Sequence, residues 1–224
     1  MKIKGAIFDC DGTLIASLGF WEVFYEKAGE YYFKDKNFRP SIEDDKAMRT
    51  QNAAFIAEIL STKYKITESK EAILKRVLDI CEWYYREVVQ LKTGVRELLA
   101  HLKKKGVKMC IASAAETNLI KVVLGKHGIL DYFEGIISCT EVGAGKDKPD
   151  VFIAAEKFLA TPREQTWVFE DSLLAAQTAK AAGYPVVGVY DALGFGQAQL
   201  RELSDEFIEE DESFVKLTSK IDEK

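Results

Sequence analysis

Apolar positions follow two different periods along this chain. Residues 3–8 form a short apolar run that predicts a strand, whereas residues 17–89 contain no convincing strand pattern. In that second segment, apolar side chains recur every three or four residues, which is the period of amphipathic helices. One such series comprises Trp21, Phe24, Tyr25 and Ala28. The pattern therefore predicts a strand followed by a long segment that is entirely helical.

From Thr93 onward, strand-like and helix-like segments alternate. The predicted helices cover residues 95–105, 118–127, 150–159 and 172–182. Continuous apolar runs predict strands over residues 107–112, 135–138, 166–169 and 185–190. Strands that are apolar throughout and alternate with helices form parallel sheets covered on both faces. We therefore predict an α/β fold whose core is a Rossmann-like parallel sheet with helices on both faces.

The helical segment interrupts this α/β pattern directly after its first strand. We assign residues 1–16 and 92–224 to the α/β core and residues 17–91 to an inserted helical domain. Open parallel sheets bind ligands at the carboxyl ends of their strands, so a segment inserted there is expected to act as a lid. The charged tail, residues 201–224, carries the acidic run 209–212, and we expect that run to be solvated surface.

The composition excludes several classes of partner. The chain has 224 residues, of which 47% are hydrophobic and 30% charged, as in ordinary globular proteins. A net charge of −5 gives no basic surface for nucleic acid. No apolar stretch approaches the roughly 20 residues of a membrane span, and the first apolar run is too short for a secretion signal. We expect a cytoplasmic protein, a monomer or a weak homodimer, with no nucleic-acid or membrane partner.

The four cysteines are scattered along the chain and show neither the close pairs of a zinc site nor a setting for disulfides. Three of them lie in or beside apolar runs, namely Cys10, Cys110 and Cys139. We predict that these three are small buried hydrophobic side chains rather than reactive groups.

Candidate chemistry begins where the first strand ends, in residues 9–14, Asp-Cys-Asp-Gly-Thr-Leu. Side chains at positions i and i+2 of a strand share a face, so Asp9 and Asp11 are expected to project side by side. Gly12 then permits a sharp exit from the strand. Like charges at close range raise each other's pKa unless a cation lies between them. The pattern favours a metal or a shared proton, although Asp-Gly is also a common turn dipeptide.

Three further features follow later strands and should lie at the same edge of the sheet. The hydroxyl of Ser113 and the backbone N–H of Ala114 can bind a phosphate, although a serine here can equally cap a helix. Lys146, in a glycine-containing loop that enters a helix, can neutralise a phosphoryl group, and an exposed lysine is the ordinary alternative. Glu170 and Asp171 end a strand and enter a helix, and the alternative is that Asp171 or Ser172 only caps that helix.

The acidic residues among these features suggest a metal. If Asp9, Asp11, Glu170 and Asp171 gather at one edge, four carboxylates repel one another strongly without a hard cation. Mg²⁺ prefers such oxygen ligands together with substrate phosphate. We therefore predict Mg²⁺ as the cofactor.

In their order along the chain, these segments resemble the four motifs of the haloacid dehalogenase-like superfamily. The matching segments are 9–13, Ser113, Lys146 with 149–150, and 170–171. Phe152 and residues 181–183 are similar to the family's surroundings of its third and fourth motifs, and the helical insert is similar to its cap. Within the superfamily, the chain looks most like the phosphatases and the β-phosphoglucomutase-like members.

One motif departs from the family pattern. The third motif usually reads Lys-Pro-x-Pro-Asp, whereas this chain has Asp147 in place of the first proline. Lys148 thereby becomes a second candidate for the phosphate-facing lysine. The spacing to Pro149 and Asp150 favours Lys146.

The resemblance implies covalent phosphoryl transfer on a small phosphorylated metabolite. Asp9 would attack phosphorus to form an aspartyl-phosphate, and Asp11 would protonate the leaving oxygen and then activate water. Mg²⁺ would be held by Asp9, the backbone carbonyl of Asp11 and Asp171, with Glu170 as an outer or alternate ligand. The phosphoryl oxygens would be held by Ser113, Ala114 and Lys146.

Several activities share these motifs. Asp11 argues against the dehalogenase branch, which lacks the second aspartate. A sugar-phosphate mutase of the β-phosphoglucomutase type needs cap groups that bind a second phosphate and exclude water. The cap offers Lys46 and Arg49, but the arginine does not align with the mutase pattern. We predict a Mg²⁺-dependent phosphatase acting on a small phosphate monoester, with the mutase as the alternative; retention of all four motifs disfavours a catalytically silent binding module.

Overall fold

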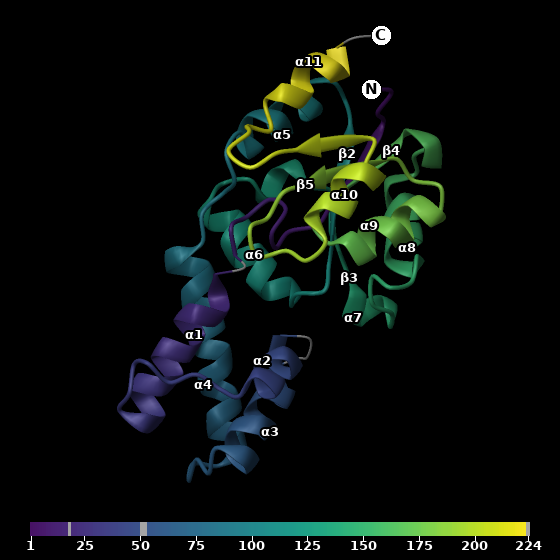
Figure 1. Cartoon of the computed structure of the whole chain (residues 1–224). Helices are drawn as coiled ribbons and strands as arrows, with labels where there is room; N and C mark the ends of the chain where they lie inside the picture. Colours follow the sequence, from purple (N-terminus) through teal and green to yellow (C-terminus); the bar gives the residue numbers. More distant parts are fainter. Residues whose placement is uncertain (18, 50–52, 223–224) are drawn as a thin grey trace. The chain divides into compact units, whose positions relative to one another are not determined.

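The computed structural model describes residues 1–17, 19–49 and 53–222, and the side chain of Arg49, the cap cation considered above, lies outside that description. The chain divides into two compact units, shown in Figure 1. The α/β unit comprises Met1–Leu18 and Val89–Lys224, and the helical unit comprises Gly19–Val88. A membrane-spanning helix would need a longer apolar stretch than any helix in the described part of the chain provides.

The α/β unit is built on a parallel sheet, as the sequence predicts, and the sheet has six strands, one more than the predicted strand segments. Its strand order is β3-β2-β1-β4-β5-β6. The strands are β1 (Gly5–Phe8), β2 (Lys108–Ser113), β3 (Ile136–Ser138), β4 (Thr166–Glu170), β5 (Val186–Val189) and β6 (Glu206–Ile208). Phe8 of β1 pairs with Ile111 of β2 on one side and with Phe169 of β4 on the other. The chain order reverses between β1 and β4, and such a reversal is where open α/β sheets bind ligands.

Helices cover both faces of this sheet (Figure 1). On one face, α8, α9 and α10 pack on a buried cluster that includes Ile7, Cys110 and Val168. On the other, Phe8 stacks on Phe169 with ring centroids 4.2 Å apart. The helices and helical turns are α5 (Val95–Lys104), α6 (Thr117–Lys126), η3 (Leu130–Tyr132), α7 (Cys139–Val142), α8 (Asp150–Leu159), η4 (Arg163–Gln165), α9 (Leu173–Ala181), α10 (Gln197–Leu203) and α11 (Lys216–Asp222).

The helical unit has its own hydrophobic core. Its elements are α1 (Phe20–Ala28), the π-helical turn η1 (Gly29–Phe33), α2 (Ile42–Arg49), α3 (Ala53–Lys63), α4 (Lys70–Trp83) and the π-helical turn η2 (Tyr84–Val88). Phe24, Tyr25 and Ala28 are buried in that core, as their helical spacing predicts, while Trp21 packs at its edge. This insert is therefore a packed unit in its own right.

Residues 201–222 combine an exposed acidic run with folded elements. The run 209–212 is exposed or half-buried, as expected, whereas the segment around it is structured. It supplies β6 and α11, and its apolar side chains Phe214, Leu217 and Ile221 are buried. β6 pairs with β5 as the edge strand of the sheet. Its three residues, Glu-Phe-Ile, are too few to show a strand pattern.

The predicted burial of three cysteines is confirmed. Cys10, Cys110 and Cys139 are buried and free, and burial raises the pKa of each thiol above its usual value. Because the thiolate is the reactive form, all three behave as small hydrophobic groups.

Candidate active site

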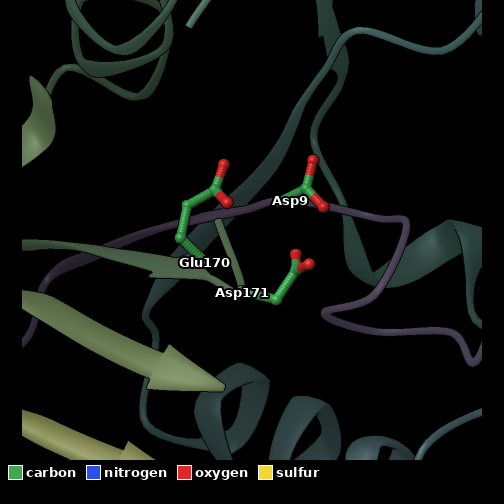
Figure 2. A group of neighbouring side chains, drawn as sticks. All are labelled: Asp9, Glu170 and Asp171. Carbon is green, nitrogen blue, oxygen red and sulfur yellow. The ribbon is translucent and has the colours of Figure 1, made fainter. Parts of the chain in front are cut away.

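Three carboxylates meet at the carboxyl ends of two neighbouring strands (Figure 2). Asp9 directly follows β1, Glu170 is the last residue of β4, and Asp171 comes next. The parallel register explains why they meet, because the N–H of Asp9 donates to the carbonyl oxygen of Phe169 over 2.9 Å. One carboxylate oxygen from each lies within 4.8 Å of the others. All three residues are at least nine-tenths buried.

Lys146 places its ammonium group between two of these carboxylates. Its Nζ donates to Oδ1 of Asp9 and to Oε1 of Glu170. Burial alone would lower the pKa of Lys146, but the two carboxylates more than offset that effect and raise it. The lysine therefore stays charged. Lys148, the second candidate lysine, is exposed.

The loop that follows β1 contacts the carboxylate of Asp171. Thr13 Oγ1 donates a hydrogen bond to Asp171 Oδ1 over 2.9 Å. Gly12 has a φ of +79°, and a Cβ there would lie 2.4 Å from Asp171 Oδ2. The glycine thus meets a conformational and a steric requirement at once. Thr13 was not among the predicted site residues, and its place directly after Gly12 in the first motif is the signal that could have found it.

The environment opposes the charged form of the acidic residues. Burial chiefly raises the pKa of Glu170 and of Asp171, and the charge of Asp9 raises both further. Three carboxylates with one lysine leave the group formally negative. Oxygen donors of this kind, buried and close together, fit a hard divalent cation. The alternative capping role falls to Ser172, whose Oγ accepts from the N–H of Ala175.

The remaining predicted residues share this edge without joining the carboxylate group. Asp11 is half-buried, and its backbone forms an isolated β-bridge with Ile15. Among the described residues, its carboxylate does not belong to the close group formed by Asp9, Glu170 and Asp171. Ser113, the last residue of β2, is buried, and its Oγ accepts from the N–H of Ala115 over 3.1 Å. Ala114 is exposed. Ser113 therefore shapes the turn after β2 and does not cap α6.

Comparison with known proteins adds three findings. The family model for haloacid dehalogenase-like hydrolases matches residues 3–183. The chain is 28% identical over 201 residues to the phosphorylated carbohydrates phosphatase of Thermotoga maritima, a match covering 88% of this chain and 90% of that protein. It is also 28% identical over 217 residues to the Arabidopsis thaliana protein SUPPRESSOR OF QUENCHING 1, chloroplastic. That match covers 94% of this chain but spans only 20% of the longer protein.

Among solved structures, the fold is similar to that of beta-phosphoglucomutase from Clostridium difficile. The TM-score is 0.71, with 19% identity, and the match covers 99% of this chain and 98% of that one. At this identity the likeness speaks for the shared fold alone.

Proposed function

This chain belongs to the haloacid dehalogenase-like hydrolases, and from that premise we propose that it is a Mg²⁺-dependent phosphatase acting on a small phosphate monoester. The observation that carries the proposal is the buried group of Asp9, Glu170 and Asp171 with Lys146 at the carboxyl ends of β1 and β4. A relative that acts on phosphorylated carbohydrates supports a sugar phosphate as the substrate.

We assign the covalent chemistry to the two aspartates of the first loop. A carboxylate oxygen of Asp9 attacks phosphorus, and the bond from phosphorus to the substrate oxygen breaks as Asp11 donates its proton to that oxygen. Asp11, now ionised, takes a proton from a water molecule that attacks the aspartyl-phosphate. Inorganic phosphate leaves, and Asp9 is free again.

The remaining residues hold charge in place. Asp9, Asp171 and the backbone carbonyl of Asp11 would hold Mg²⁺, with Glu170 as an outer or alternate ligand. When bound, the cation supplies positive charge to the phosphoryl oxygens. Lys146 already fixes the carboxylate of Asp9 through its hydrogen bond to Oδ1.

Phosphate binding falls to the loop after β2 and to Lys146. The Ser113 hydroxyl and the Ala114 N–H lie at the carboxyl end of β2, the strand that pairs with β1. From there they can donate to the phosphoryl oxygens. The fixed ammonium of Lys146 would balance their charge in the transition state.

The test is phosphate release from a panel of sugar phosphates, nucleotides and small phosphorylated metabolites, with and without Mg²⁺. We expect release that requires the metal and is fastest on one class of monoester. A purified, folded protein that releases no phosphate from any of them contradicts the proposal.

The same four motifs would also serve a sugar-phosphate mutase, so the panel needs one further assay. β-Glucose 1-phosphate is supplied with a catalytic amount of the glucose bisphosphate. We expect inorganic phosphate to be the main product. Glucose 6-phosphate formed faster than inorganic phosphate would reverse the ranking of the two activities.

A further inference from the structure

A second hydrogen-bonded connection reaches the backbone of Asp171 rather than its carboxylate. Gln197, the first residue of α10, donates from Nε2 to the backbone carbonyl oxygen of Asp171 over 3.2 Å. Its Oε1 accepts from the N–H of Asp191, also over 3.2 Å. The side-chain amide of Gln197 thus joins the loop after β4 to the loop after β5.

Asp191 is itself firmly anchored. Its carboxylate forms an ion pair with Lys92 at 3.0 Å, and the two side chains are only 11% and 16% exposed. Lys92 Nζ also donates to the carbonyl oxygen of Tyr190 over 2.7 Å. The backbone N–H of Lys92 donates to the carbonyl oxygen of Leu14 over 2.9 Å. These contacts run from the loop after β1 to the backbone of Asp171 without passing through the three carboxylates.

The glycines around Gln197 fit its side chain closely. A Cβ at Gly194 would lie 2.4 Å from Gln197 Nε2, and a Cβ at Gly196 would lie 2.6 Å from a methyl carbon of Leu173. Gly196 also has a φ of +73°. A bulkier loop would displace the amide from the Asp171 carbonyl, so the loop is shaped around this contact.

We propose that Gln197 is a positioning residue for the carboxylate group, an inference that rests on the proposed metal-dependent function. Asp171 repels Asp9 and Glu170, and Thr13 restrains only its carboxylate. Gln197 restrains the backbone of the same residue, so the oxygen donors stay together before a cation binds. Such prior ordering increases the affinity for a cation because less of the binding free energy is used to move the ligands.

The role requires an amide. Gln197 donates to one backbone group and accepts from another, and an amide offers both functions at the end of one side chain. Gln197→Glu keeps the acceptor for Asp191 but loses the donor to Asp171. Gln197→Met keeps the approximate length and loses both.

The experiment is a Mg²⁺ titration by calorimetry on the full chain and these two variants, with Gln199→Glu and Gln199→Met as matched controls. Gln199 lies on the same helix and is exposed. We expect the dissociation constant to rise about tenfold or more in both Gln197 variants and to stay unchanged in the controls. At limiting Mg²⁺ phosphate release falls in the Gln197 variants, and saturating Mg²⁺ restores kcat.

Three outcomes overturn the inference in distinguishable ways. If Gln197→Glu binds Mg²⁺ as tightly as the unaltered protein, Gln197 does not position the site, while the proposed function stands. If the variants only lower the melting temperature in chelator and leave the Mg²⁺ affinity unchanged, the role is structural. If the unaltered protein neither binds Mg²⁺ nor releases phosphate, the proposed function fails, and this inference fails with it.

Discussion

Each unit of the molecule contains buried carboxylates. The surroundings favour the ionised form in the helical unit and disfavour it in the α/β unit. In the helical unit, Asp44 is 5% exposed and accepts from Ser41 Oγ over 2.8 Å and from Tyr64 over 2.9 Å. Lys63 forms an ion pair with it. The hydrogen bond from Lys63, followed by those from Ser41 and Tyr64, holds the pKa of Asp44 below its usual value.

In the α/β unit, the one lysine pairs with only two of the three carboxylates, Asp9 and Glu170. The pKa values of Glu170 and Asp171 are raised by burial and by neighbouring charge. Ionised Asp44 therefore stabilises its unit. Burial and neighbouring charge instead disfavour the ionised forms of Glu170 and Asp171. Perturbed groups of the second kind cluster at functional sites, because binding or catalysis supplies the missing compensation. The comparison separates a carboxylate that contributes to stability from carboxylates that contribute to function.

The largest expected effect is on turnover, at Asp9. Asp9→Asn removes the proposed nucleophile while keeping an oxygen that can accept from Lys146. We expect phosphate release to fall by about a thousandfold or more, since loss of a covalent nucleophile typically has effects of that order or larger. The measurement is kcat on the best substrate of the panel. Asp131→Asn, at an exposed aspartate of the same unit, is the control. A variant that kept a tenth of the rate would show that Asp9 is not the nucleophile.

The next effect is on stability, at Asp44. Asp44→Asn breaks the ion pair with Lys63 and weakens the hydrogen bonds from Ser41 and Tyr64. We expect the free energy of unfolding to fall by about 2 kcal/mol, the usual contribution of hydrogen bonds to a buried charged group. Denaturant unfolding measures it, with Glu43→Gln on the same helix as an exposed control. An unchanged free energy would remove the contrast between the two centres.

The third effect, on stability at Asp171, has the opposite sign to the effect at Asp44. Asp171→Asn removes a charge that its surroundings oppose, so we expect the protein in chelator to be more stable by about 1 kcal/mol, as is common when a functional site is relieved of strain. The same variant should lose its stabilisation by Mg²⁺. Melting temperatures with chelator and with Mg²⁺ test both points. If Asp171→Asn destabilised the protein in chelator, contacts within the protein would already offset the repulsion between the carboxylates without a cation.

The sequence predicts the sheet and its flanking helices well because each is marked by a strong apolar period. The helix predicted at residues 150–159 is α8 with the same bounds, while β6 was missed because a three-residue edge strand carries too little pattern. Asp9, Glu170 and Asp171 were identifiable because each ends or directly follows a strand, and Lys146 because it lies in a glycine-containing loop that enters a helix.

The supporting contacts were not predictable in the same way. Thr13 meets Asp171 only because β1 and β4 are neighbours in the sheet, and Gln197 lies 26 residues beyond the carbonyl that it contacts. Asp44 looks like any helical aspartate until Ser41, Lys63 and Tyr64 are brought around it by packing. Contacts of this kind depend on tertiary structure and leave no local pattern.

The smallest expected effect is the pH dependence of the stability that Asp44 contributes to the helical unit. A group whose pKa is lower in the folded state contributes stability above its unfolded pKa, and that contribution is lost as the pH falls through its folded pKa. For Asp44 the unfolded value is about 3.9. The stability difference between the unaltered protein and Asp44→Asn should therefore be constant near neutral pH and shrink below about pH 4. Unfolding free energies measured in steps from pH 7 to pH 3 test this. A difference that persisted undiminished at the acid end would mean that the geometry of Asp44, rather than its charge, stabilises the helical unit.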